Sequence, residues 1–162
     1  MATGVGRHAS DGLTGHAQAN TVCVSPDGKL FATGTWHGTG AKVWMTETGQ
    51  PMQELAVAGS ATCSFSPDGK WIAFINDETG EDEIFIVKPD GTGKTQLTKN
   101  SESYRFDLSW SPDSKKIVCS DKSLKLYYVD IETKNVKQIA KSKSWELRDY
   151  AWSPDSKWLA YT

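Results

Sequence analysis

The sequence predicts an all-β protein built from a repeated antiparallel unit, and three observations support this. A Ser-Pro-Asp tripeptide recurs four times, so that the copies lie 41, 45 and 42 residues apart, beginning at Ser25, Ser66, Ser111 and Ser153. Runs of alternating strand-like character flank every copy. The composition, with 14 Gly, 7 Trp and 5 Tyr, suits an all-β domain.

The spacing of the repeat indicates the architecture. A period of about 40–45 residues is typical of β-propeller blades with four strands each. Gly or Ser and then Lys follow each tripeptide. Pro fixes φ, Asp caps its own turn and Gly tolerates a positive φ, so the element is a hairpin turn. We therefore expect a flexible leader and a propeller domain with these parts: leader 1–12, propeller 13–162, blades 17–58, 59–101 and 102–143, and half-blade 144–162.

The innermost strand of each blade precedes the turn, at residues 21–24, 62–65, 107–110 and 149–152. One face of these strands carries larger side chains: Val24, Phe65, Trp110 and Trp152, with Val22, Cys63, Leu108 and Tyr150 two residues earlier. The opposite face carries small ones: Cys23, Ser64, Ser109 and Ala151. This alternation at period two predicts sheets that neighbouring blades cover on both sides.

The remaining strands follow in order. Second strands are predicted at residues 30–33, 71–74, 116–119 and 158–161. Third strands are predicted at 41–44, 83–87 and 124–129, and fourth strands at 52–55, 95–98 and 136–139. The fourth strands are the more polar, as expected of an outer strand with an open edge. The fourth copy has two strands, which gives about three and a half blades.

The first blade resembles a WD repeat over residues 13–58. The segments that carry this resemblance are residues 13–16, 25–29, 32–34 and 42–44. The resemblance implies a structural hydrogen-bond network of His16, Thr35 and Trp44. His37 stands where the family carries Asp, and Met45 replaces the family's final Asp.

Residues 59–162 look like the propeller blades of TolB-type proteins and tricorn-type proteases. The segments that carry this resemblance are residues 83–91, 96–98, 110–116, 126–130 and 149–155. It implies a fold more than a function, because one fold hosts many activities. The two patterns meet near residues 59–63, which favours an engineered or recombined chimera, with a natural fragment as the alternative.

Charge and hydropathy bear on partners and compartment. The net charge of −2 and the pI near 5.9 give no reason to expect nucleic-acid binding. No apolar run approaches the length of a membrane span. No signal peptide is visible at the N-terminus, so we expect a cytoplasmic or recombinant protein.

Cysteine and histidine usage predicts no cofactor, metal site or enzyme. Cys23, Cys63 and Cys119 lie in strand-like runs without close pairing in the sequence. Their odd number and wide spacing argue against a disulfide framework or a zinc site, and we expect buried, reduced thiols. The three His residues lack a carboxylate or Cys at metal-ligand spacing. No Gly-x-Ser-x-Gly motif is present. Residues 91–94, Gly-Thr-Gly-Lys, are interpreted as a hairpin turn rather than a phosphate loop.

One polar group merits consideration as a binding site. Inner strands begin at the central channel of a propeller, so the polar residues at those positions should surround it. The candidate ligand-binding residues at this rim are Arg105, Asp107, Arg148 and Asp149, which suit a peptide terminus or a small polar ligand. The alternative is structural Asp–Arg pairing at the strand entry. Trp36 and Trp145 are likewise either partner anchors or inter-blade packing residues.

Closure of the ring decides the expected function. The strand predicted at 158–161 would leave an open edge, which invites association. The N-terminal segment could complete the half-blade and close a four-blade ring, or two chains could complete each other and form seven or eight blades. Blade wedge shape favours the second, because a four-blade closure would leave voids. We expect a homodimeric, non-catalytic, self-assembling scaffold; the alternatives are an accessory peptide-gating propeller of a larger tricorn-like hydrolase and a channel-binding protein.

Overall fold

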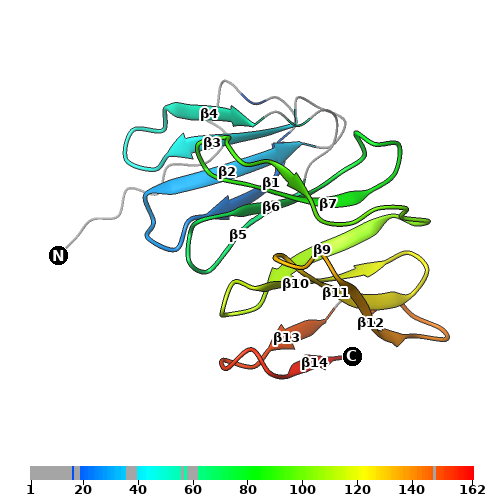
Figure 1. Ribbon diagram of the computed structural model, residues 1–162. Coiled ribbons are helices and arrows are strands. Elements are labelled where there is room, and N and C mark those ends of the chain that lie inside the picture. The colour runs from blue at the N-terminus through cyan, green and yellow to red at the C-terminus, as the bar shows by residue number, and fades with distance from the viewer. Residues whose placement is uncertain (1–15, 17–18, 36–39, 56, 58–61, 148) are drawn as a thin grey trace.

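The computed structural model describes residues 16, 19–35, 40–55, 57, 62–147 and 149–162. All regular secondary structure in these residues is β (Figure 1). Three four-stranded antiparallel sheets and one two-stranded sheet follow one another along the chain, and in each the strands are adjacent in sequence order. Blade architecture is therefore confirmed.

The strand bounds agree with the predicted ranges to within a few residues. Blade one comprises β1 (Ala19–Val24), β2 (Leu30–Thr35), β3 (Ala41–Met45) and β4 (Pro51–Leu55). Blade two comprises β5 (Thr62–Phe65), β6 (Ile72–Asn76), β7 (Glu83–Val87) and β8 (Thr95–Gln96). Blade three comprises β9 (Arg105–Trp110), β10 (Lys116–Asp121), β11 (Lys125–Asp130) and β12 (Val136–Lys141), and the last sheet comprises β13 (Tyr150–Trp152) and β14 (Leu159–Tyr161).

The repeated turn has the predicted chemistry. The Ser25 hydroxyl donates to the Asp27 carboxylate at 2.7 Å and accepts the backbone N–H of Leu30 at 2.9 Å. The carboxylate also accepts the N–H of Lys29, and Gly28 has a φ of 71°. The hydroxyl bond and the backbone bond lower the pKa of Asp27. In the third and fourth copies a Ser takes the left-handed position of Gly28.

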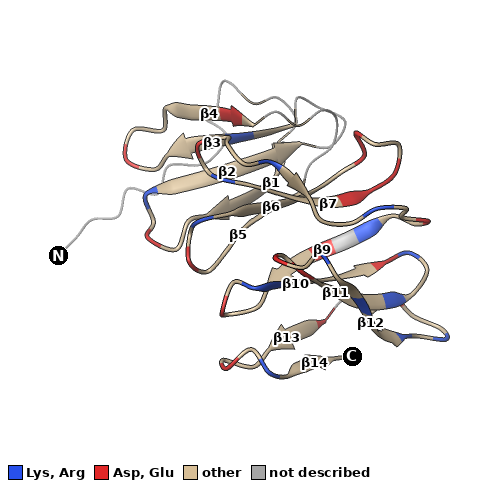
Figure 2. Ribbon diagram, viewed as in Figure 1, with Lys and Arg blue, Asp and Glu red and all other residues tan. Residues whose placement is uncertain are grey.

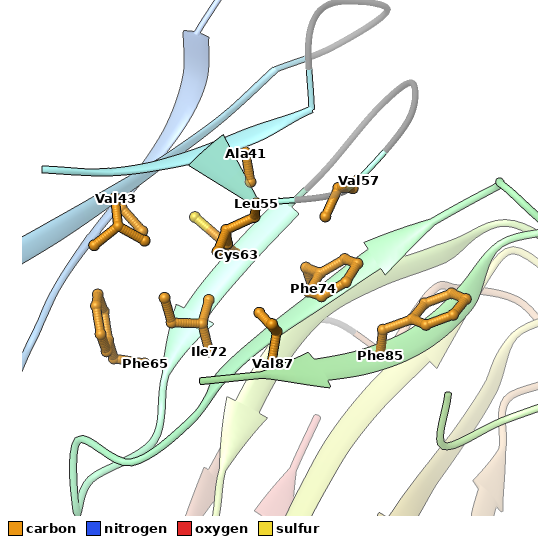
Figure 3. Packing of buried hydrophobic residues seen from close by; sticks show 11 residues of the cluster. Ala41, Val43, Leu55, Val57, Cys63, Phe65, Ile72, Phe74, Phe85 and Val87 are labelled. Carbon is orange, nitrogen blue, oxygen red and sulfur yellow. The ribbon is translucent and has the colours of Figure 1, made fainter. Parts of the chain in front are cut away.

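The core lies between the sheets. Figure 3 shows the first junction, where Ala41, Val43 and Leu55 of blade one face Ile72, Phe74 and other side chains of blade two. A second cluster joins blades two and three, with Ile84 and Ile86 on one side and Ile117 and Val129 on the other. Blade two thus buries one face against blade one and the other against blade three.

Candidate functional site at the blade junctions

Arg105 lies in a buried polar network rather than at an accessible rim. Its side chain is 7% exposed, and one guanidinium nitrogen lies 3.2 Å from a carboxylate oxygen of Glu83, whose side chain is 2% exposed. Its Nε donates to the backbone oxygen of Asp82 at 2.8 Å, and a further N–H donates to the Tyr127 hydroxyl. The contacts with Glu83 and Asp82 join blade three to blade two, and the bond to Tyr127 lies within blade three.

The Glu83 carboxylate accepts hydrogen bonds from three residues. Its carboxylate accepts the hydroxyl of Thr98 and, at 2.7 Å, the backbone N–H of Ser101, in addition to Arg105. A buried charge requires such partners, because its desolvation is otherwise costly. The ion pair of Arg105 is therefore with Glu83 of the neighbouring blade rather than with an Asp of its own strand entry.

Of the described rim candidates, neither Asp107 nor Asp149 bonds the Arg105 side chain. Asp107 was expected at a strand entry, but β9 begins two residues earlier and Asp107 occupies an irregularity with a φ of 45°. Its exposed carboxylate follows from this bulge, which leaves one residue outside the ladder. Asp149 is also exposed, and its backbone oxygen accepts the N–H of Thr162. Arg148 lies outside the described residues.

The network implied for blade one exists with a different hydroxyl. The Trp44 indole N–H donates to the Thr33 hydroxyl oxygen at 2.8 Å, and the Thr33 hydroxyl lies 2.6 Å from Nδ1 of His16. Because the Thr33 oxygen accepts from Trp44, its own proton is free to bond a neutral His16. Burial, and then the charge of Lys42, lower the pKa of His16 and favour that neutral form.

Thr35, expected in this network, has another role. Its hydroxyl donates to the backbone oxygen of Gly40 and accepts the N–H of Gly40, both at 3.1 Å, so it closes the loop between β2 and β3. The strand register explains the correction. Trp44 lies opposite Phe31, so Thr33 is the nearer hydroxyl on that face and Thr35 lies about 7 Å further along the strand.

The second and third junctions share a polar pattern. The indole N–H groups of Trp110 and Trp152 donate to the backbone oxygens of Ser64 and Ser109 on the preceding blade, at 3.1 and 3.3 Å. The hydroxyls of Ser114 and Ser156 accept the backbone N–H groups of Asp68 and Asp113 at 3.1 and 3.0 Å. These bonds recur at equivalent repeat positions, so they set the register of one blade on the next.

The first junction lacks this pattern, because Phe65 and Gly69 occupy the equivalent positions. It holds a pair of thiols instead. The Cys23 sulfur lies 3.4 Å from the Cys63 sulfur, with the Cys23 thiol as donor. The faces assigned from the sequence contained the signal, since Cys23 is on the small face of one blade and Cys63 on the facing side of the next. All three cysteines are free thiols, as expected; Cys63 and Cys119 are buried and Cys23 is half-buried.

Exposed apolar side chains lie at both ends of the stack of sheets. Val22 and Val24 of β1 are 67% and 58% exposed, and Trp158, beside β14, is 75% exposed. Figure 2 shows that β1, β13 and β14 carry no charged residues, whereas charges gather in the turns. Trp145 is 82% exposed, so it does not pack between blades; Trp36 lies outside the described residues.

The described residues also contain features that sequence patterns did not indicate. A hollow of about 410 Å³ lies between β4 and two turns of blade two, lined by Met52, Lys70, Trp71, Lys88, Pro89 and Asp90. Three separate segments build it, which is why no local motif marks it. Residues 91–94 do form part of a hairpin loop, closed by the N–H of Lys88 on the oxygen of Thr92.

Within the described part of the chain, no group of three or more His, Cys, Asp or Glu side chains is placed to hold a metal ion. Among the same residues, no helix is long and apolar enough to cross a membrane.

Comparisons with known proteins agree with this architecture. The family model for the WD domain, G-beta repeat, matches residues 9–40 and 95–127, so the WD pattern also occurs beyond the first blade. A tricorn protease homolog of Saccharolobus solfataricus is 28% identical over 142 residues, which cover 88% of this chain and 12% of that protein. The small ribosomal subunit protein RACK1y of Oryza sativa subsp. japonica is 33% identical over 106 residues, 62% of this chain and 31% of that protein.

A solved structure shares the fold. The putative TolB from Agrobacterium tumefaciens superposes with a TM-score of 0.62 at 20% identity, covering 86% of this chain and 57% of that one. The chain spans less than a third of the length of the tricorn protease homolog and of RACK1y, the two curated relatives. The sheets, the repeat and these likenesses together establish an all-β chain of propeller blades that resemble both WD repeats and the blades of TolB-type and tricorn-type proteins.

Proposed function

We propose that this chain is a non-catalytic interaction scaffold that assembles with a second copy of itself through the two terminal blade faces. The observation that carries the proposal is the exposure of apolar residues on those faces, chiefly Val22, Val24 and Trp158. Isolated exposed apolar residues are ordinary, but the strands that carry them or lie beside them, β1, β13 and β14, have no charged residues.

The internal junctions supply the rule for the proposed contact. At the first junction, Phe65 and Ile72 of blade two pack on Ala32 and Val43 of blade one. A following blade thus places its large face on the small face of the preceding one. Applied to the exposed faces, this rule docks Val22 and Val24 of one copy on the last sheet of the other.

The small side chains of the last sheet fit this role. Ala151 of β13 and Ala160 of β14 are exposed and pair with each other across the sheet. Two such contacts related by a two-fold axis would close a ring of seven or eight blades, whereas an unclosed rotation would give filaments.

The experiment is a light-scattering mass measurement at micromolar concentration. The expected mass is twice the 17.8 kDa of the chain. Val24→Glu should give the monomer mass, since it places a charge in the contact. Val136→Glu is the matched control, because Val136 is 51% exposed on the outer strand β12 and should leave the dimer intact. A monomeric wild-type protein would overturn the proposal.

A second candidate is an accessory propeller of a larger tricorn-like hydrolase, which gates or delivers peptides. The match to a tricorn protease homolog over 88% of this chain but 12% of that protein favours it. Under this alternative, further blades of the same chain would cover the exposed faces. A reading frame that continues past Thr162 into a hydrolase domain would support it and count against the self-assembling scaffold.

Two finer proposals remain. The first is that a peptide or small ligand binds near Asp107 and Asp149, which a thermal-shift screen with peptides and glycans tests. A rise in melting temperature that is lost in Asp107→Asn would support this site. No rise in melting temperature would exclude the ligands screened. A recombined origin is proposed from the sequence patterns that meet at residues 59–63, although the WD match at residues 95–127 lies beyond that point. It predicts that separate parents will match the chain on either side of residues 59–63 at high identity.

A further inference from the structure

We propose that Cys23 and Cys63 form a redox-active dithiol site, which closes to a disulfide that joins blade one to blade two. The two sulfurs lie 3.4 Å apart. Cys23 lies on β1 and Cys63 on β5, the innermost strands of adjacent sheets, so the bond would cross the first blade junction at its inner edge.

The geometry requires little movement. A disulfide has an S–S length near 2.05 Å, so the sulfurs must approach each other by about 1.4 Å. Rotations about the side-chain bonds of two facing cysteines supply such a shift. The third cysteine, Cys119, belongs to the separate cluster between blades two and three, and so serves as an internal control.

The surroundings assign different roles to the two thiols. The Cys23 thiol donates its hydrogen bond to the Cys63 sulfur, which lowers the pKa of Cys63, and the Thr21 hydroxyl lies 3.9 Å from the same sulfur. The same bond raises the pKa of Cys23. Cys63 is therefore the thiolate that attacks first, since the thiolate is the nucleophile.

Hydrogen peroxide is the oxidant that fits, because Cys63 is only 7% exposed and a small molecule is needed to reach it. The Cys63 thiolate attacks one peroxide oxygen, the O–O bond breaks, and the leaving hydroxide takes up a proton to become water. The Cys23 sulfur then attacks the sulfenic sulfur of Cys63. The S–S bond forms, the S–O bond breaks, and the hydroxide that leaves takes the Cys23 proton, so two thiols lose two electrons and peroxide becomes two waters.

A Cys23–Cys63 disulfide would stabilise the first blade junction. The first junction lacks the Trp and Ser hydrogen bonds of the other two, since Phe65 and Gly69 replace those residues. The disulfide would supply a covalent tie at that junction. It would also close a chain loop of about forty residues, which restricts the unfolded state. Oxidation should therefore raise the melting temperature, by about 10 °C for a domain of this size.

The test treats the full-length chain with hydrogen peroxide, alkylates the remaining thiols, and maps peptides without reduction. The expected result is a Cys23–Cys63 linked peptide with Cys119 still alkylated, reversed by dithiothreitol and accompanied by the higher melting temperature. Cys119→Ser should leave both observations unchanged, and Cys23→Ser should abolish both. Wild-type protein in which Cys23 stays alkylated while Cys63 is overoxidised, or in which the disulfides join different chains, would overturn the proposal.

Discussion

Ser114 adopts a left-handed backbone conformation, with φ 61°, and from it accepts the backbone N–H of Asp68 across the blade junction at 3.1 Å. The first two repeats carry Gly at this position, and the last two carry Ser. An L-residue in this region costs about 1–2 kcal/mol. The inter-blade hydrogen bond offsets part of that cost, since such a bond contributes about 1 kcal/mol.

Substitutions at Ser114 should separate these two effects. Ser114→Ala keeps the strain and loses the bond, so we expect a loss of about 1 kcal/mol in the free energy of unfolding. Ser114→Gly loses the bond but relieves the strain, so its stability should lie within about 0.5 kcal/mol of wild type. Urea unfolding measures both, and an equal loss in the two variants would contradict this account.

A position without the bond provides the matched control. Gly69 has a φ of 70° at the first junction, and an added Cβ would lie 3.7 Å from Cδ of Pro26, an ordinary contact. Gly69→Ala should therefore lose about 1 kcal/mol through backbone strain alone.

Breaking the buried ion pair should have a much larger effect. Glu83→Gln leaves the positive charge of Arg105 buried without its ion-pair partner, which we expect to cost about 3 kcal/mol. The control is Glu54→Gln, because Glu54 pairs with Lys42 at 2.8 Å but its side chain is 66% exposed. That loss should stay below about 1 kcal/mol. Urea is the suitable denaturant because it does not screen charge, and similar losses in the two variants would show that burial adds nothing.

The turns, the strand order and the blade count could be predicted from sequence because each depends on local chemistry. The Ser-Pro-Asp turn needs only residues within one hairpin, such as Ser25 and Asp27. Strand alternation likewise depends on neighbours within a single sheet. The fourth strand of blade two is shorter than predicted, two residues rather than four, because the backbone N–H of Ile84 bonds the Thr98 hydroxyl instead of a ladder carbonyl.

The candidate site could not be predicted, because its contacts cross between blades. The partner of Arg105 is Glu83, on another sheet, and sequence proximity pointed to Asp107 instead. A bulge also displaced Asp107 from the expected strand entry, and bulges leave no reliable local pattern. The closeness of Cys23 and Cys63 required both the face of each residue and the order in which blades stack.

His16 should make stability depend on pH. Its folded-state pKa is lowered, by burial first, while the unfolded value lies near 6.5. The unfolded chain therefore binds more protons as pH falls below 6.5, so this contribution to stability is complete above that pH and is lost below it. Two charged groups face His16. Lys42 lowers the pKa of His16 further, whereas Glu54 raises it. Glu54 stays ionised between pH 7.5 and pH 5.5, because the Lys42 ammonium lowers the pKa of Glu54.

The variant His16→Asn tests this account, because its amide oxygen can still accept from Thr33 but does not titrate. The free energy of unfolding of wild type should fall between pH 7.5 and pH 5.5, and that of the variant should fall less. Equal slopes would show that another group causes the pH dependence.

Gly40 should tolerate no side chain. Its φ is 82°, and an added Cβ would lie 2.0 Å from the backbone oxygen of Val57, a contact that requires the backbone itself to move. We expect Gly40→Ala to cost about 3 kcal/mol or more, from strain and steric clash together. Gly49→Ala is the matched control, since Gly49 has a φ of 67° but nothing within 4 Å of the added Cβ, and should lose about 1 kcal/mol.

The Thr35 hydroxyl bonds both the N–H and the carbonyl oxygen of Gly40, so a shift of the Gly40 backbone would also break these two bonds. Equal losses in the two variants, measured by urea unfolding, would show that the approach of Val57 does not constrain this loop.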